Sequence, residues 1–276
     1  MNSGKENAKR APWPRRHIIL LAIVAAVAAL LLDAFIIEPD NLQVNHYVIH
    51  GNVQSPLKIA DLSDLHTRGM GRPEREVVDA LVREKPDVIL VTGDSIADPY
   101  GNYAACMKVY KELGALNPPL GVWFVRGNWE NLQPVPHERQ FYREAGINLL
   151  VNQNHELRPD VWLVGLDDII NGRPNLPEAM RGVPENAYKI VIFHEPIFFL
   201  AVAGKVNLVF AGHTHGGQVR IPFVKPFWLP FGSGNFLEGW YTEKNARMYV
   251  NRGVGMSDIP VRFLCRPEVA FITLEP

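Results

Sequence analysis

The chain contains only two cysteines, Cys106 and Cys265, among its 276 residues. They are too few for a disulfide framework, and neither has a second cysteine at a metal-binding spacing such as Cys-x-x-Cys. Basic residues are not in excess, since 28 Lys and Arg stand against 29 Asp and Glu, so nothing suggests a nucleic acid polymer as partner. The sequence also has no repeat and no low-complexity tract. We therefore expect two free, buried cysteines in one sizeable domain.

The N-terminus carries one long apolar run. A tail rich in Lys and Arg (1–17) precedes residues 18–37, whose single charge is Asp33, and residues 38–56 contain no Lys or Arg. About 20 apolar residues span a bilayer. We predict a basic cytoplasmic tail (1–17), a transmembrane anchor (18–37), a linker (38–56) and one domain (57–276), held outside a bacterial cytoplasmic membrane by the charge bias. A cleaved signal peptide is the alternative, since Arg15-Arg16 resembles a twin-arginine signal, but no small-x-small cleavage pattern follows.

Side chains typical of metal sites follow five apolar runs of strand length. The runs cover residues 57–62, 87–91, 121–125, 190–193 and 208–211. The side chains that follow them are Asp64, His66, Asp94, Asn128, His194, His213 and His215. Because ligand sites commonly lie beyond the carboxyl ends of strands in α/β sheets, we expect these side chains along one rim of a sheet. Their oxygens and imidazoles suit Mn, Fe or Zn, and they are enough for two ions.

Helical patterns alternate with the first of these strands, which indicates α/β crossovers. The expected helices cover residues 72–84, 103–115 and 136–145. Later short apolar runs at 148–151, 161–166, 248–251 and 269–274 suggest a second sheet.

The series Asp-x-His, Gly-Asp, Gly-Asn, His and Gly-His-x-His, in this order, resembles the calcineurin-like metallophosphoesterases over residues 57–276. Segments 212–222, 251–255 and 262–268 resemble a membrane-anchored branch, which includes phosphodiesterases and the UDP-2,3-diacylglucosamine pyrophosphatases of lipid A synthesis. The resemblance implies a four-layer α-β-β-α sandwich of two mixed sheets with flanking helices.

The resemblance also implies a role for each ligand. Asp64, His66 and His215 would hold one divalent ion. Asn128, His194 and His213 would hold the second, with Asp94 bridging the two. Manganese is the expected metal, with iron or zinc as alternatives. The nucleophile would be a metal-activated hydroxide, and Asp94, Asn128 and His66 would be the catalytic residues.

One position departs from the family pattern. Many relatives have a His after Gly-Asn that is thought to protonate the leaving oxygen, whereas this chain has Trp129. An indole N–H donates a hydrogen bond but is not an acid near neutral pH. The substitution therefore favours good leaving groups, as in pyrophosphates or activated diesters. Asp98 lies one residue farther from Asp94 than the acid of the usual Gly-Asp-x-x-Asp, so we do not expect it to be a ligand.

Other polar residues are weaker candidates. Trp129, Arg220 and Arg262 are candidate substrate contacts, although surface pairing is the alternative for both arginines. The pair Asp167-Asp168 is expected to bond turn backbone. An aromatic, Pro-rich segment (222–231) follows the last ligands and could cover acyl chains, enter the membrane interface, or fold over the core.

These features predict a membrane-anchored phosphoesterase acting on a phosphodiester or pyrophosphate bond, with an amphiphilic nucleotide-linked lipid such as UDP-2,3-diacylglucosamine as substrate. A cytoplasmic-face lipid A role would conflict with the charge bias. The alternatives are an extracytoplasmic phosphodiesterase or phosphatase for soluble nucleotides, and an inactive metal-binding protein. The sequence leaves the oligomeric state open.

Overall fold

Two six-stranded sheets form the centre of the fold in the computed structural model, which describes residues 14–96, 103–132, 137–257 and 259–276. The strands of the first sheet are, in spatial order, β1 (Gln43–His50), β12 (Glu268–Glu275), β2 (Leu57–Leu62), β3 (Val88–Val91), β4 (Val122–Phe124) and β5 (Asn148–Leu149). Those of the second sheet are β10 (Gly239–Glu243), β11 (Ala246–Val250), β9 (Leu208–Ala211), β8 (Tyr188–Ile192), β7 (Val161–Gly165) and β6 (Gln153–Arg158).

Both sheets are mixed. In the first, β2, β3, β4 and β5 run parallel, while β12 is antiparallel to β2. In the second, β7, β8, β9 and β11 run parallel, and β6 and β10 close the edges in antiparallel pairs. Strands β3, β8 and β9 are buried at every residue. Burial on both faces explains why these strands are apolar in the sequence at every position except Lys189 in β8.

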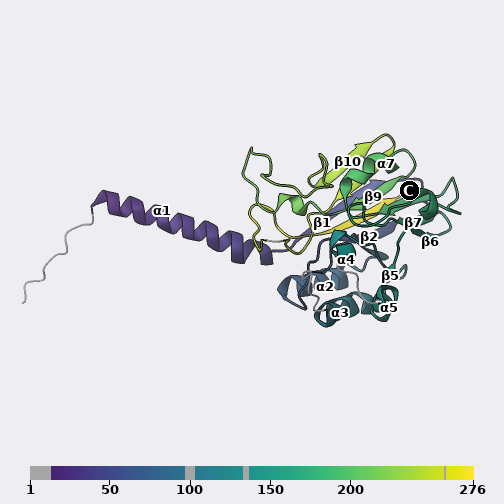
Figure 1. Cartoon of the computed structure of the whole chain (residues 1–276), viewed down its shortest axis with the longest axis horizontal. Helices are drawn as coiled ribbons and strands as arrows, with labels where there is room; N and C mark the ends of the chain where they lie inside the picture. Colours follow the sequence, from purple (N-terminus) through teal and green to yellow (C-terminus); the bar gives the residue numbers. More distant parts are fainter. Residues whose placement is uncertain (1–13, 97–102, 133–136, 258) are drawn as a thin grey trace, which may run out of the picture.

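Helices cover the outer faces of the two sheets. The first sheet packs against α2 (Arg72–Glu84), α3 (Tyr103–Ala115) and α5 (Glu138–Glu144), as Figure 1 shows. The second packs against the short helices α6 (Leu176–Ala179) and α7 (Phe199–Val202). A third apolar cluster, with Ile59 and Leu90 from one sheet and Leu163 and Ile190 from the other, fills the space between the sheets. The predicted four-layer sandwich is confirmed.

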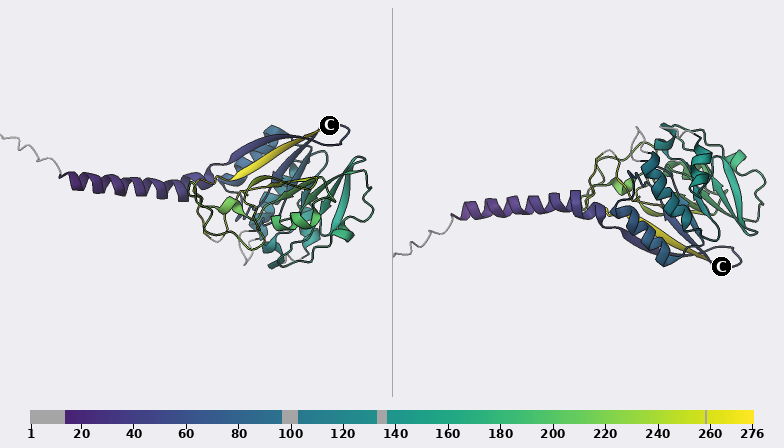
Figure 2. Two further views of the ribbon diagram at one scale, coloured as in Figure 1. Left: turned by 90° about the horizontal axis from the view of Figure 1, so that it is seen from above. Right: turned by 90° about the horizontal axis from the view of Figure 1, so that it is seen from below.

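Helix α1 (Arg15–Leu32) projects from one end of the domain (Figures 1 and 2). It continues through a π-helical turn (Asp33–Ile37) and a 3₁₀ turn (Glu38–Asp40), giving 26 residues with a mean hydropathy of 2.8 in its most apolar window. Its length and composition are sufficient to cross a membrane. It begins at Arg15, three residues before the predicted anchor.

Two expectations about strands are wrong. Residues 38–56 were expected to be a linker, but they contain β1, which pairs in parallel with β12 and belongs to the first sheet. This edge strand is half exposed and polar, so it lacks the apolar run of a buried strand. The runs at 148–151 and 269–274 were assigned to a second sheet, yet β5 and β12 both lie in the first. Strand order depends on long-range pairing, which local periodicity does not encode.

Candidate metal centre

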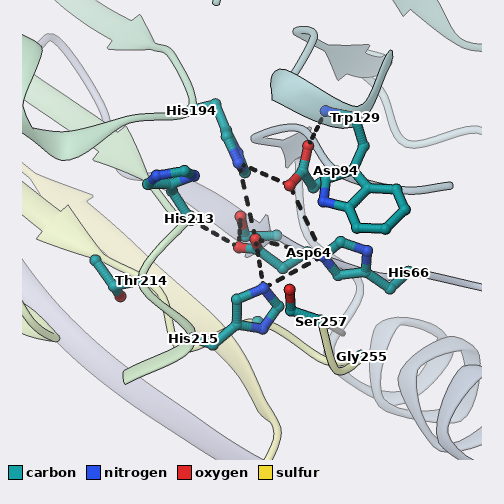
Figure 3. Close-up of polar contacts among 12 residues, drawn as sticks. Asp64, His66, Asp94, Trp129, His194, His213, Thr214, His215, Gly255 and Ser257 are labelled. Atoms are coloured by element: carbon teal, nitrogen blue, oxygen red, sulfur yellow. Dashed lines mark hydrogen bonds and ion pairs between the residues drawn. The ribbon is translucent and has the colours of Figure 1, made fainter. Parts of the chain in front are cut away.

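All seven predicted ligands lie in segments that follow strands, as expected. Asp64 and His66 follow β2, Asp94 follows β3, and Asn128 begins the short helix α4 (Asn128–Leu132) after β4. His194, His213 and His215 follow β8 and β9, which belong to the other sheet. The prediction of a single rim is therefore wrong, because the site lies where the carboxyl ends of strands from two packed sheets meet. Figure 3 shows six of these side chains converging.

The backbone at these positions is strained. Five of the seven residues, Asp64, His66, Asp94, His213 and His215, have positive φ between 38° and 70°. A non-glycine residue in this region costs on the order of 1 kcal/mol, and such residues cluster at functional sites. This backbone conformation turns the side chains toward a common centre. Favourable packing elsewhere in the fold offsets its energetic cost.

The first group of ligands is Asp64, His66 and His215. The Nε2 atom of His215 lies 3.3 Å from Asp64 Oδ1 and 3.2 Å from His66 Nε2. Two atoms about 2.1 Å from one ion, at angles between 90° and 110°, lie about 3.0–3.4 Å apart. These two distances fit a shared ion.

The second group is Asp94, His194 and His213. His194 Nε2 lies 3.1 Å from Asp94 Oδ2, and the same oxygen lies 3.7 Å from His66 Nε2 in the first group. Asp94 thus faces both groups. All the ligand atoms within each group lie within 4.8 Å of one another. The arrangement supports two divalent ions, and it does not identify the metal.

Several buried polar atoms at this centre form no hydrogen bond with any described residue. They include Asp64 Oδ1, Asn128 Oδ1 and His194 Nε2, although the last lies 3.1 Å from Asp94 Oδ2. A buried polar atom without a partner costs about 1–3 kcal/mol. A cation that accepts lone pairs from these oxygen and nitrogen atoms removes this cost, so the residues present fit divalent ions.

The charges of the site are set by burial and by close pairing. Burial opposes ionisation of Asp94, but His194, His66 and the backbone N–H of Trp129 together lower its pKa to about 2. Burial, together with His194, lowers the pKa of His213 to about 4. Burial also holds the pKa of His215 well below its ordinary value. These two imidazoles are therefore neutral at pH 7, as metal ligands must be.

A Calcineurin-like phosphoesterase family model matches residues 57–217, a region that contains all seven predicted ligands. The chain belongs to this family. It is 29% identical to the uncharacterized metallophosphoesterase YkuE of Bacillus subtilis over 251 residues, with 87% of each chain covered. It is 30% identical to the phosphodiesterase YaeI of Escherichia coli, covering 80% of this chain and 83% of that protein. A Danio rerio transmembrane protein with a metallophosphoesterase domain is 27% identical, covering 79% of this chain and 53% of that protein.

Backbone contacts orient the ligands of this metallophosphoesterase. His194 Nδ1 lies 2.7 Å from the carbonyl oxygen of Thr92, which leaves Nε2 to face the centre. The Asp64 Oδ2 atom accepts hydrogen bonds from Ser63 Oγ at 2.5 Å and from the His213 N–H at 2.9 Å. Among the described residues the other oxygen, Asp64 Oδ1, has no hydrogen-bond donor. Such outer contacts fix both the tautomer and the direction of each ligand.

Glu130 ties two ligand loops together, a role that the sequence analysis missed. Its buried carboxylate accepts hydrogen bonds from the backbone N–H groups of Asp94 at 2.9 Å, Ser95 at 2.8 Å and Gly127 at 2.8 Å. Burial, with a contribution from Asp94, raises its pKa to about 7. The only signal in the sequence was its position two residues after Asn128.

The two arginines predicted as substrate contacts, Arg262 and Arg220, both bind other groups of the protein. Arg262 is fully buried, and its guanidinium donates to the carbonyl oxygens of Gly255 at 2.6 Å, Cys265 at 3.0 Å and Gly253 at 3.1 Å. In the described part of the chain these carbonyl groups enclose the guanidinium, which contradicts the expectation of a substrate contact. Arg220 pairs with Glu238, which agrees with surface pairing.

Three other residues singled out in the sequence are Trp129, Asp168 and Asp98. Trp129 packs edge-on against His66, with ring centroids 5.2 Å apart, at the border of the ligand cluster (Figure 3). Asp168 accepts hydrogen bonds from the backbone of Ile170 and Asn171, as expected of a turn. Asp98 lies outside the described residues.

Two cavities meet at the ligand cluster. One, of about 300 Å³, is lined by Asp94, Asn128, Trp129 and other residues around the ligands. The other, of about 320 Å³, is mostly apolar, with Val219, Phe227 and Val261 in its wall. The two share His215, Trp228 and Ser257. An apolar compartment thus opens directly beside the metal centre.

Proposed function

We propose that this metallophosphoesterase is anchored in a bacterial cytoplasmic membrane by α1 and hydrolyses a phosphodiester or pyrophosphate bond of an amphiphilic, nucleotide-linked substrate. The observation that carries the proposal is the apolar cavity that shares His215, Trp228 and Ser257 with the cavity over the ligands. A phosphoryl group at the ligands would place an attached acyl chain within reach of this compartment. Burying that chain is favourable, at about 0.8 kcal/mol per CH₂ group.

The ligand set suggests how the reaction proceeds. Asp64, His66 and His215 would hold one ion and Asn128, His194 and His213 the other, with Asp94 facing both. When bound, two divalent ions supply Lewis acidity that activates water and neutralises charge on the phosphoryl oxygens. Manganese is our expectation, with iron or zinc as alternatives.

Trp129 limits how basic the leaving oxygen can be. Its indole, placed against His66, cannot give up a proton near neutral pH. Bonds whose leaving oxygen is already weakly basic, such as those of a pyrophosphate, are therefore the preferred targets.

The charge distribution around α1 supports one orientation in the membrane. Arg15 and Arg16 begin α1, and no Lys or Arg occurs from residue 38 to residue 57, which favours a domain outside the cytoplasm. We propose the substrate by its chemical class, an amphiphilic nucleotide-linked phosphoester or pyrophosphate. The name of the Danio rerio relative supports a membrane-linked member of the family.

The second candidate is a phosphodiesterase for soluble nucleotides, favoured by the name of YaeI. Two esters with one nucleotide headgroup, with and without a single acyl chain, distinguish the candidates. The amphiphilic function predicts a lower KM for the acylated ester, and Val261→Trp, which fills the apolar cavity, should raise that KM alone. Val82→Trp, on the exposed side of α2, is the matched control. Equal KM values for both esters would favour the soluble substrate.

The third possibility is a protein that binds metal without being an enzyme. Turnover of bis-p-nitrophenyl phosphate with added Mn²⁺ separates an enzyme from a binder. Absence of turnover with any of Mn²⁺, Fe²⁺ or Zn²⁺ would support the binder.

A further inference from the structure

The segment of residues 221–231 lies at the end of the domain from which α1 emerges (Figures 1 and 2). We call residues 221–231 the aromatic loop. Its exposed side chains include Phe223, with 108% relative exposure, Phe231 with 85%, Phe227 with 78% and Trp228 with 62%. Between residues 221 and 237 the sequence has one charge, Lys225. Folded domains rarely present so many exposed rings in one segment unless the surface meets another apolar phase.

The end of α1 is fastened to the domain next to this loop. The backbone N–H of Arg262 donates to the carbonyl oxygen of Ala34 at 3.0 Å. The Glu38 carboxylate accepts hydrogen bonds from the backbone N–H groups of Leu264, at 2.8 Å, and Cys265. Ala34 and Glu38 are both buried. The helix is therefore held against residues 262–265 instead of hanging on a free linker.

The same segment is bonded to the start of the aromatic loop. The backbone N–H of Phe263 donates to the carbonyl oxygen of Gln218 at 2.9 Å. The carbonyl oxygen of Phe263 accepts a hydrogen bond from the backbone N–H of Arg220, also at 2.9 Å. Contacts thus continue from α1 through residues 262–265 to residues 218–220, directly before the loop. A bilayer crossed by α1 must then have its surface close to the aromatic loop.

We propose that the aromatic loop, with exposed Ile259 and Leu264, is a membrane-docking surface that enters the interface of the bilayer crossed by α1. Aromatic side chains are favoured at the level of the lipid headgroups. Lys225 adds attraction to anionic lipids. Because Trp228 and Phe231 also line the cavity over the ligands, docking would hold the opening of that cavity at the membrane surface. This inference rests on the proposed anchoring by α1 and does not depend on the substrate.

The test places nitroxide labels on the full-length chain in nanodiscs of zwitterionic and anionic phospholipid. Single cysteines are introduced as Phe223→Cys in the loop, Val24→Cys in α1 and Glu156→Cys in β6, at the far end of the domain (Figure 1). The native cysteines are buried, and labelling of the unsubstituted chain gives the background. Power saturation with oxygen and with a water-soluble nickel chelate reports whether each label lies in lipid or in water.

Docking predicts that the label at position 223 has the high oxygen-to-nickel accessibility ratio of position 24, while position 156 has the low ratio of an aqueous site. An aqueous label at 223 with a lipid-exposed label at 24 would overturn docking and leave the anchoring intact. An aqueous label at 24 would overturn both. Lipid exposure at 223 and 156 alike would indicate unspecific adsorption. Spin–spin broadening of a water-exposed label at position 223 would indicate that the loop contacts a second copy of the chain. This result would also contradict docking.

Discussion

Removing the carboxylate of Glu130 should loosen both loops that it joins. This side chain is 1% exposed and accepts three short backbone hydrogen bonds, from Asp94, Ser95 and Gly127. In Glu130→Ala these three N–H groups lose their acceptor in a buried setting, at about 1–3 kcal/mol each. The lower end of this range applies, because the pKa of Glu130, raised to about 7, indicates that burying its charged carboxylate is itself unfavourable.

The expected loss is thus about 3 kcal/mol, which corresponds to a fall in Tm of about 6–12 °C for a domain of this size. Activity should fall as well, since Asp94 and Asn128 are presented by the loosened loops. Glu130→Gln should be intermediate, because one oxygen can still accept while the amide NH₂ faces other donors.

Thermal unfolding of the detergent-purified chain, followed by circular dichroism, measures the stability, and turnover of bis-p-nitrophenyl phosphate measures the activity. Glu112→Ala, at an exposed position on α3, is the matched control and should leave both unchanged. A Glu130→Ala variant with the Tm and turnover of the control would refute the reasoning that these hydrogen bonds position the ligand loops.

Two substitutions and two truncations test further features of the protein. Asp94→Asn should abolish activity and weaken metal binding at both groups, because a neutral amide cannot balance two divalent ions; two tightly bound ions in this variant would contradict the bridging role. In the unsubstituted enzyme, rates on aryl phosphodiesters should fall steeply as the leaving phenol becomes more basic, and Trp129→His should flatten that dependence; a flat dependence from the outset would show that another group supplies the proton. A truncated protein that begins at Asp33 keeps the contacts of Glu38 and should retain turnover on a small ester, whereas one that begins at Gln43 loses them and should unfold at lower temperature; equal Tm values would argue against that contact.

The candidate ligands could be found in the sequence because each follows a buried strand. Runs such as those before Asp94 and His213 are apolar throughout, and the chemistry of the next residues stands out against them. The order of the blocks then resembled one family, and the match over residues 57–217 confirms it. The layers followed from the family, with the helices of the first sheet close to their predicted ranges.

What could not be predicted depends on contacts between distant parts of the chain. The sequence does not show that β1 pairs with β12, 225 residues further along the chain, or that candidate ligands from two sheets meet. Arg262 appears free in the sequence, yet it is enclosed by the carbonyl groups of a folded loop. The role of Glu130 requires three N–H groups from two separate loops, and these come together only after the sheet has formed.

Metal analysis of the purified chain, combined with activity before and after chelation, tests the central claim most directly. The account predicts two divalent ions per chain, loss of bis-p-nitrophenyl phosphate hydrolysis when they are removed, and recovery on addition of Mn²⁺. A chain that binds no divalent ion under these conditions, or that hydrolyses the ester equally well after complete removal of metal, would contradict it.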